Sequence, residues 1–243
     1  MSKAIITLCL ILFPFITYAQ EKTYYLGIGS ANVMDTYLSP YSYKGFGMSV
    51  TREVQYSHTL HTLSLSASSI ENKAGNVDAY SGDIRYGIAH QFDIYQADNL
   101  TVKAGPMGTM MLGCAYNTRN GNNPANVHSS LMSGASARID YDLHICGRSF
   151  PLQYVIDFPL IGIAYSPNYG QAYYEEFVLG NSDHNIVFAY TGNTPSLRQR
   201  LTVAFPAGKH QLRVGYLGQY DQSSYNNLRY HSYSHQFVIG LTM

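Results

Sequence analysis

Apolar and polar residues alternate with a period of two over long stretches of this chain, and this feature constrains the fold more than any other. In residues 79–94 one face carries Tyr80, Ile84, Tyr86, Ile88, Phe92 and Ile94, and the other carries small or polar residues. The same alternation recurs in residues 130–145 and 211–220. Because successive side chains of a β-strand point to opposite faces, this period predicts strands with one apolar and one polar face. No amphipathic helix of comparable length follows residue 20, so the pattern indicates an all-β protein.

The spacing of the predicted strands indicates a closed up-and-down barrel of about ten antiparallel strands. The segments are 23–30, 44–54, 59–69, 78–94, 99–116, 128–145, 150–166, 195–206, 210–221 and 229–243. Short connections alternate with longer polar ones, as in outer-membrane barrels. Residues 186–190, inside the longest connection, either extend a neighbouring strand beyond the membrane or belong to an additional pair of strands. Eight and twelve strands therefore stay open as alternatives.

Three features place the apolar face on the outside of this barrel, in lipid. Charged residues make up 12% of the chain, about half the usual quarter, so the polar face lacks the many Lys and Glu of a solvated sheet. Several strands exceed twelve residues, which is long enough to cross a membrane at a tilt. The last strand keeps alternating to the final residue, Met243. A soluble periplasmic ligand-binding barrel is the alternative.

The first residues predict export from the cytoplasm. Lys3 precedes an apolar stretch that ends at Thr17-Tyr18-Ala19, which is typical of a cleaved signal peptide. We therefore expect a signal peptide at 1–19 and one barrel domain at 20–243. Fifteen basic against fifteen acidic residues leave no cationic excess, so a nucleic-acid partner is excluded.

Two cysteines follow the predicted signal peptide. Cys114 and Cys146 fall near opposite ends of consecutive strands, too far apart for a disulfide. We expect two free thiols, with Cys114 facing lipid and Cys146 near the lumen.

Three stretches of the sequence resemble a known family. They are the signal ending YAQ, the segment IRYGIAHQFDIYQADNLTVKAGP and the ending YHSYSHQFVIGL. They resemble an uncharacterised family of small Bacteroidota outer-membrane β-barrel proteins, a domain of unknown function, although Met243 replaces the usual terminal aromatic. The resemblance covers most of the chain after the signal and implies a fold and an outer-membrane location. It implies no catalytic residues.

The polar face gathers charges of both signs, which would point into the lumen of a ten-stranded barrel. The predicted network consists of Glu53, Asp83, Arg85, Arg138, Asp140, Asp142, Arg198, Arg200 and Arg213. Balanced charges in a small barrel favour a plug of paired Arg and carboxylate groups. The alternative is a narrow, ion-selective pore.

Other residue groups suggest chemistry less strongly. Asp140, Asp142 and His144 share one strand face, as a metal site or an outer-membrane protease would require. His231 and His235 lie near Ser232 and Ser234, which suggests a lipid-acting hydrolase or acyltransferase, but the two pairs fall on opposite faces. In the longest loop we expect a surface contact formed by Tyr173, Tyr174 and Phe177.

The sequence thus predicts a non-enzymatic integral outer-membrane barrel of structural, interaction or narrow-pore type. Its expected partners are membrane lipids and other outer-membrane proteins, and no cofactor is expected. The lipid-acting enzyme and the soluble periplasmic barrel are the alternatives.

Overall fold

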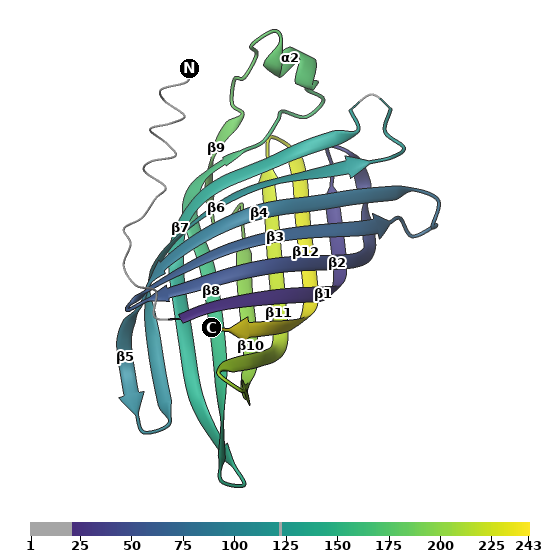
Figure 1. Cartoon of the computed structure of the whole chain (residues 1–243). Coiled ribbons are helices and arrows are strands. Elements are labelled where there is room, and N and C mark those ends of the chain that lie inside the picture. The colour runs from purple at the N-terminus through teal and green to yellow at the C-terminus, as the bar shows by residue number, and fades with distance from the viewer. Residues whose placement is uncertain (1–20, 122) are drawn as a thin grey trace, which may run out of the picture.

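Ten long antiparallel strands close into a barrel (Figure 1). The computed structural model describes residues 21–121 and 123–243, so the predicted signal peptide at 1–19 lies outside the described residues. β1 pairs with β12, and β8 pairs with β10, which closes the ring. The barrel strands are β1 (Glu21–Asp35), β2 (Ser39–Tyr56), β3 (Thr59–Glu71), β4 (Asp78–His90), β6 (Leu100–Asn117), β7 (Ala125–Ile145), β8 (Arg148–Tyr165), β10 (Ser196–Ala207), β11 (His210–Tyr225) and β12 (Leu228–Thr242).

Two short strands account for the ambiguity in strand number. β9 (Ile186–Tyr190) pairs with the far end of β8, and β10 continues along the same edge of β8. Residues 186–190 therefore extend a barrel strand, which confirms ten strands and makes eight and twelve wrong. β5 (Phe92–Ala97) pairs with β6 beyond the end of β4.

The single strand predicted over 78–94 is broken at Gln91. The Gln91 side chain is fully buried and its Nε2 donates to Ser136 Oγ at 3.0 Å, while its backbone N–H donates to His58 O at 2.7 Å. The bond to His58 continues the register of β3 and β4 by one residue, whereas the residues after Gln91 pair with β6 alone, so β4 ends at His90 and β5 begins at Phe92.

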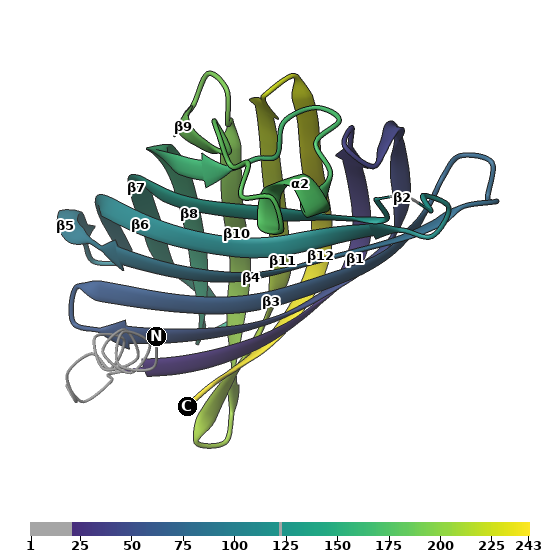
Figure 2. The same cartoon turned by 90° about the horizontal axis from the view of Figure 1, so that it is seen from above.

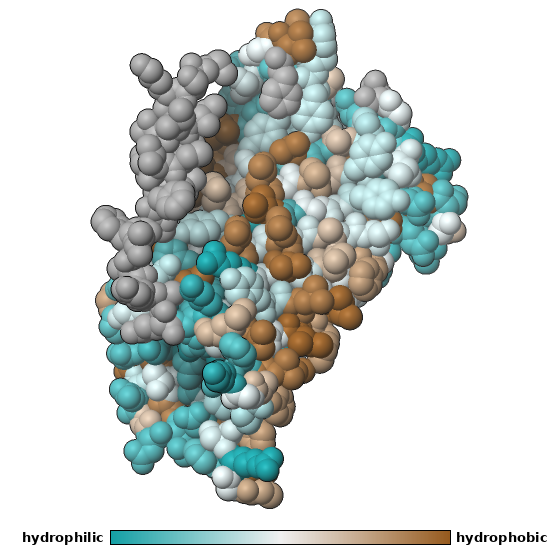
Figure 3. Space-filling model, viewed as in Figure 1, coloured by the Kyte–Doolittle hydropathy of each residue, from teal (hydrophilic) through white to brown (hydrophobic). Residues whose placement is uncertain are grey.

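The apolar face of the strands lies outside and the polar face lies inside. Figure 3 shows hydrophobic residues gathered across the middle of the molecule. The outward residues include Leu26, Ile28, Met48, Val50, Leu63, Leu65, Ile84, Leu112, Leu131, Ile163, Leu201, Phe237, Ile239 and Leu241, all exposed. Buried polar residues alternate with them, among them Thr51, Glu53, Ser64, Thr202 and Gln236. This is the reverse of a soluble barrel, in which burial of apolar side chains fills the interior.

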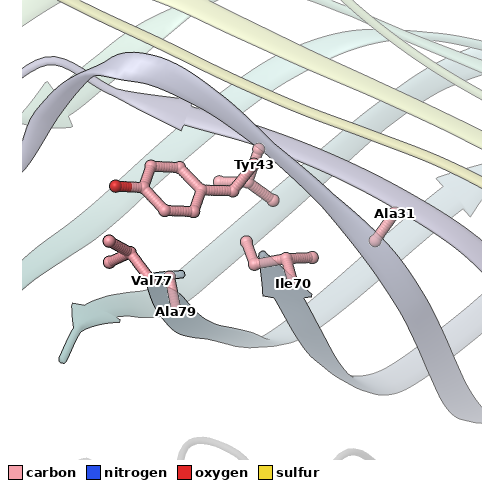
Figure 4. Close-up of a cluster of buried hydrophobic side chains, with 6 residues drawn as sticks. Ala31, Tyr43, Ile70, Val77 and Ala79 are labelled. Atoms are coloured by element: carbon pink, nitrogen blue, oxygen red, sulfur yellow. The ribbon is translucent and has the colours of Figure 1, made fainter. Parts of the chain in front are cut away.

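The barrel has two unlike ends, which we call the loop end and the turn end. The loop end carries the long connections, including residues 166–185 with α2 (Tyr173–Phe177), and the turn end carries the tight turns and both described chain ends (Figure 1). An apolar cluster fills the loop end of the interior between β1 and β4, formed by Ala31, Val33, Tyr43, Ile70, Val77 and Ala79 (Figure 4). The described part of the chain holds no helix long and apolar enough to span a membrane.

Cys114 and Cys146 are both free and both exposed. The predicted free thiols are therefore confirmed, and Cys114 lies on the outward, apolar face of β6. The prediction that Cys146 lies near the lumen is wrong, because this residue sits at the β7–β8 turn with a φ of 51°.

Candidate functional site

The lumen is crossed by an ion pair between Glu53 on β2 and Arg200 on β10. Arg200 Nη2 lies 2.7 Å from Glu53 Oε2, and Nη1 bonds the second carboxylate oxygen, so the pair is bidentate. Both side chains are under 10% exposed. Since β2 and β10 are not neighbours in the sheet, this pair ties opposite walls together.

Two further groups hold Arg200 in place. Its guanidinium carbon lies 4.4 Å above the centre of the Tyr25 ring, and its Nη2 also donates to Gln153 Oε1 at 3.3 Å. The Tyr25 ring lies across Gly240, where an added Cβ would come within 2.4 Å of the ring. Gly240 therefore makes room for a cation–π contact that supports the buried charge.

A second cross-lumen pair joins Arg85 on β4 to Asp221 on β11. Arg85 Nη2 lies 2.7 Å from Asp221 Oδ2, and Arg85 Nε lies 3.8 Å from Asp83 Oδ1. Gln219 Nε2 donates to the same Asp221 oxygen at 2.8 Å, and the hydroxyl of Ser66 donates to Asp83. One arginine therefore lies between two carboxylates in the middle of the lumen.

The turn end of the lumen holds two more arginine pairs. Arg213 Nη2 lies 3.0 Å from Glu21 Oε1, and Arg213 Nε donates to Thr242 Oγ1 at 2.9 Å. Arg138 Nε lies 2.6 Å from Asp140 Oδ2. Four inward arginines are thus each paired with a carboxylate.

Arg198 is the exception among the inward arginines. It donates to Ser64 and Thr51 hydroxyls at 3.4 Å, and no carboxylate lies within 4.0 Å of it in the part of the chain that is described. It lines a cavity together with Asp157, Arg85 and Asp221.

All of the predicted network residues face the lumen except Asp142. Asp142 is exposed near the β7–β8 turn and makes no ion pair with another described residue, so its place in the network is wrong. Near the β7–β8 turn, β7 extends beyond its pairing with β6, so its last residues are exposed. The sequence reasoning missed Glu21, Gln153 and Asp221 as partners. Asp221 continues the inward alternation of β11, but the strand was expected to end at that residue, whereas it continues to Tyr225.

Two small cavities lie in the lumen beside the Arg85–Asp221 pair. Their volumes are about 30 and 40 Å³, and Thr109, Pro159 and Ser196 line both of them together with Arg85 and Asp221. A buried water needs roughly 10–15 Å³ by this measure, so each of these two cavities has room for about two or three waters.

Residues 166–185, which we call the cap, lie over the loop end of the barrel (Figure 2). Tyr37 OH donates to Gln171 O at 2.7 Å, and Tyr173 OH bonds Val127 N at 2.8 Å and Asn126 Oδ1 at 3.0 Å. Glu176 is buried and accepts a hydrogen bond from Tyr165. Several separate hydrogen bonds therefore dock the cap onto the strand ends.

A carboxylate and an imidazole lie beneath the cap. Asp35 Oδ2 is 3.0 Å from His128 Nε2 and accepts from Asn126 Nδ2 at 2.9 Å. The His128 ring stacks on Tyr230 with centroids 4.0 Å apart. Asn126 thus links the cap residue Tyr173 to a polar cluster that no sequence pattern singled out.

The predicted surface contact of the cap needs correction. Tyr173 packs against Tyr37, with ring centroids 5.9 Å apart, and faces the barrel. Tyr174 is 62% exposed, as expected, and the Phe177 side chain lies outside what is described. Because α2 presents successive residues to different sides, Tyr173 and Tyr174 cannot both face outward.

Replacing Tyr173 by phenylalanine is expected to loosen the cap. The variant loses the hydroxyl that bonds Val127 N and Asn126 Oδ1, and such a loss corresponds to about threefold to tenfold faster amide exchange. Hydrogen exchange of residues 166–185 measures this, with the exposed Tyr174→Phe as the matched control. Equal exchange in both variants would show that the Tyr173 hydroxyl does not hold the cap.

The phenols of Tyr37 and Tyr173 limit the pH range in which the cap stays docked on the barrel. Burial, and then the negative charges of Glu176 and Asp35, raise the pKa of Tyr37 above its ordinary 10.0. Burial also raises the pKa of Tyr173. Because the folded pKa values are raised, docking is fully present below pH 10 and is lost as pH rises through them. A difference titration of tyrosine absorbance against Tyr173→Phe should show this phenol ionising only above pH 10.

The structure separates the residues of the possible lipid hydrolase. His231 and His235 lie on the outward face of β12, while Ser232 and Ser234 lie on the inward face. Ser30 of β1 is the register partner of His235 on the outward face, but His235 Nδ1 instead bonds Tyr216 OH at 2.7 Å. No serine hydroxyl bonds a histidine ring among the described residues.

Asp140, Asp142 and His144 do not form a metal site either. Asp140 is bound by Arg138 and Gln153, whereas Asp142 and His144 are exposed. Among residues 21–121 and 123–243, no three His, Cys, Asp or Glu side chains converge as metal ligands.

A comparison with known protein families identifies the family to which this chain belongs. Residues 16–243 match the family described as "Protein of unknown function (DUF3316)". The chain belongs to this DUF3316 family. No curated protein matches it. The membership agrees with the expected uncharacterised barrel family, and the bacterial group named by the resemblance stays a prediction.

Solved structures similar to this DUF3316 chain include several barrels. Outer membrane protease OmpT from Escherichia coli has 9% identity and a TM-score of 0.49, with 94% of this chain and 98% of that chain covered. Neisserial surface protein A has 12% identity and a TM-score of 0.38, with 91% and 96% covered. Ail of Yersinia pestis has 10% identity and a TM-score of 0.30, with 92% and 98% covered. At such low similarity we carry no residue role from them to this chain.

Proposed function

We propose that this protein is an integral outer-membrane barrel with a non-conducting lumen, which acts as a structural or interaction component and catalyses no reaction. The observation that carries the proposal is the inverted barrel, with exposed Leu26, Val50, Leu65 and Ile239 outside and a charged interior. In lipid a sheet must close to satisfy its backbone, and its outward face must be apolar. A periplasmic soluble barrel would need the opposite arrangement.

Three features support a closed lumen over a narrow pore. Ion pairs such as Glu53–Arg200 and Arg85–Asp221 join non-neighbouring strands across it. The cavities between them are small, and the cap covers the loop end. We place the loop end outside the cell, where exposed Tyr174, Val178 and Leu179 of the cap offer a contact for other outer-membrane proteins.

Cell fractionation and gel mobility test the membrane placement. We expect the protein in the outer-membrane fraction, with different mobility before and after boiling in detergent, because a closed barrel resists unfolding. Release into the soluble periplasmic fraction without a mobility shift would contradict the proposal.

Planar-bilayer recording tests the closed lumen. We expect no channel events from the purified protein, since the arginine–carboxylate pairs and the cap fill the path. Steady, ion-selective conductance by the unmodified protein would favour the narrow pore instead.

Lipid profiling tests the absence of catalysis. Cells with His231→Ala and His235→Ala are expected to show the same phospholipid and lipid A species as cells with the unmodified protein, because neither imidazole bonds a serine. Loss of a deacylated or acyl-transferred lipid in the variants would identify a lipid-acting enzyme.

A further inference from the structure

A groove on the outward side of the barrel lies where β2 and β3 reach the loop end. We call it the rim groove, and it has a volume of about 760 Å³. Sites for small molecules typically measure about 300–1,000 Å³, so the rim groove is large enough for a headgroup. Its lining residues are Tyr41, Ser42, Lys44, Glu71, Asn72, Lys73 and Ala74.

The two lysines of the rim groove lack an acidic partner. Within residues 21–121 and 123–243, no carboxylate lies within 4.0 Å of the Lys44 or Lys73 ammonium. Glu71 is the register partner of Lys44, but its Oε2 lies 3.8 Å from the Cβ position of Gly75, toward the β3–β4 turn. The two cations are therefore available to an anion from outside the chain.

Hydrogen bonds hold the turn that carries Lys73. Asn72 Nδ2 donates to Asn76 Oδ1 at 2.8 Å, and Asn72 Oδ1 accepts from Asn76 N at 3.1 Å. The backbone N–H of Gly75 donates to Asn72 O at 3.0 Å, and a φ of 66° at Gly75 allows the tight return. This turn fixes the backbone of Lys73 beside the end of β2.

On its other side the rim groove continues into a row of polar and aromatic side chains. The hydroxyl of Ser42 donates to Asn32, whose Oδ1 lies 3.4 Å from His231 Nε2. The His231 ring stacks on Tyr233 with centroids 4.5 Å apart and planes at 4°. Such amphipathic side chains are typical of the headgroup level of a membrane.

The rim groove also lies at the edge of the apolar band. On the outward face of β2, Phe46, Met48 and Val50 are exposed and lie between Lys44 and Arg52. Eight residues of strand span about 27 Å, or about 19–22 Å along the membrane normal at the usual tilt of about 35–45°, which is most of an apolar band of about 25 Å. Lys44 is therefore the first charged residue that a lipid headgroup meets above its acyl chains.

We propose that the rim groove binds the phosphate of an anionic lipid headgroup between Lys44 and Lys73, with the acyl chains along Phe46, Met48 and Leu65. The inference rests on the membrane placement proposed above. Lysine binds phosphate as a point charge, and basic pockets at the membrane surface bind anionic headgroups. The apolar band below the lysines distinguishes a lipid from free phosphate.

Native mass spectrometry of the purified barrel in detergent, titrated with lipid A, tests the proposal. The double variant Lys44→Gln, Lys73→Gln should bind lipid A about thirtyfold more weakly, since each cation contributes a factor of about 5.5. The double variant Lys22→Gln, Lys209→Gln carries the same charge change on exposed residues at the turn end and should bind as the unmodified protein does. The gel-mobility shift on the same samples shows that each variant is a folded barrel.

Several results would overturn the proposal. Equal loss of binding in both double variants would indicate net charge alone, and no loss in either would exclude the two lysines. Equally tight binding of phosphatidylcholine would indicate an apolar surface without phosphate recognition. Full displacement of lipid A by equimolar inorganic phosphate would identify a free-anion site. A folded, membrane-located barrel that fails these tests leaves the proposed function intact, so the two failures are distinguishable.

Discussion

Replacing Glu53 by glutamine is expected to lower the free energy of unfolding by about 3–5 kcal/mol, because it leaves the buried Arg200 guanidinium without its counter-ion. The carboxylate bonds Arg200 through both oxygens, and both side chains are under 10% exposed. Gln153 and the Tyr25 ring remain as contacts but carry no compensating charge. Urea unfolding of the refolded barrel in lipid vesicles measures the effect.

The exposed Asp142 provides a matched control for this substitution. Asp142→Asn makes the same chemical change outside the network and is expected to stay within about 0.5 kcal/mol of the unmodified protein. The double variant Glu53→Leu, Arg200→Met should recover most of the loss, since replacing both members of a buried pair is often neutral. Equal stability of Glu53→Gln and Asp142→Asn would show that the pair does not stabilise the barrel.

Replacing Leu65 by arginine is expected to destabilise the barrel by about 2–4 kcal/mol, the cost of an arginine at the lipid midplane of a barrel. Leu65 is 54% exposed and lies at the centre of β3, on the outward face. In water the same change would cost little, because an exposed arginine is solvated. Unfolding in vesicles of defined lipid measures the difference.

Glu71→Arg is the control on the same strand and the same face. Glu71 ends β3 at the loop end and is the register partner of Lys44 at the edge of the apolar band, where an arginine costs about 0–1 kcal/mol. A cost that rises from residue 71 to residue 65 indicates a strand that crosses the membrane. Equal, small costs at both positions would mean that this face meets water, which would contradict the membrane placement.

Most of the fold could be predicted from alternation, and the exceptions have local causes. The strand over 78–94 alternates without interruption, yet it breaks at Gln91, whose bonds to Ser136 and His58 join segments distant in sequence. The prediction for residues 186–190 stayed open because pairing with β8 depends on register. Periodicity gives the two faces of a strand, whereas its neighbours decide where it bends.

The candidate site was predictable in its composition and less so in its geometry. The inward face identified Arg85, Arg200 and Glu53, because side chains of one parity share a face. Asp221 lies on the same face, but the sequence analysis placed it as the last residue of its strand, which in the structure continues for four more residues, to Tyr225. Tyr173 was assigned to the surface because a loop tyrosine carries no periodic signal, and only its bonds to Val127 and Asn126 place it against the barrel.

By itself the sequence determined that this protein is a β-barrel, which residues face lipid and which face the lumen. The two unlike faces follow from the period-two alternation, which acts within each strand and needs no knowledge of its partners. The low charge content, the strand lengths and the alternating last strand then place the apolar face outside. Only the tertiary structure decided that Glu53 meets Arg200, that Arg85 meets Asp221 and that the cap closes the loop end. The two ion pairs join strands that are not neighbours in the sheet, and the cap contact joins a turn to a distant loop, so all three depend on how the closed ring arranges segments that are far apart in the sequence.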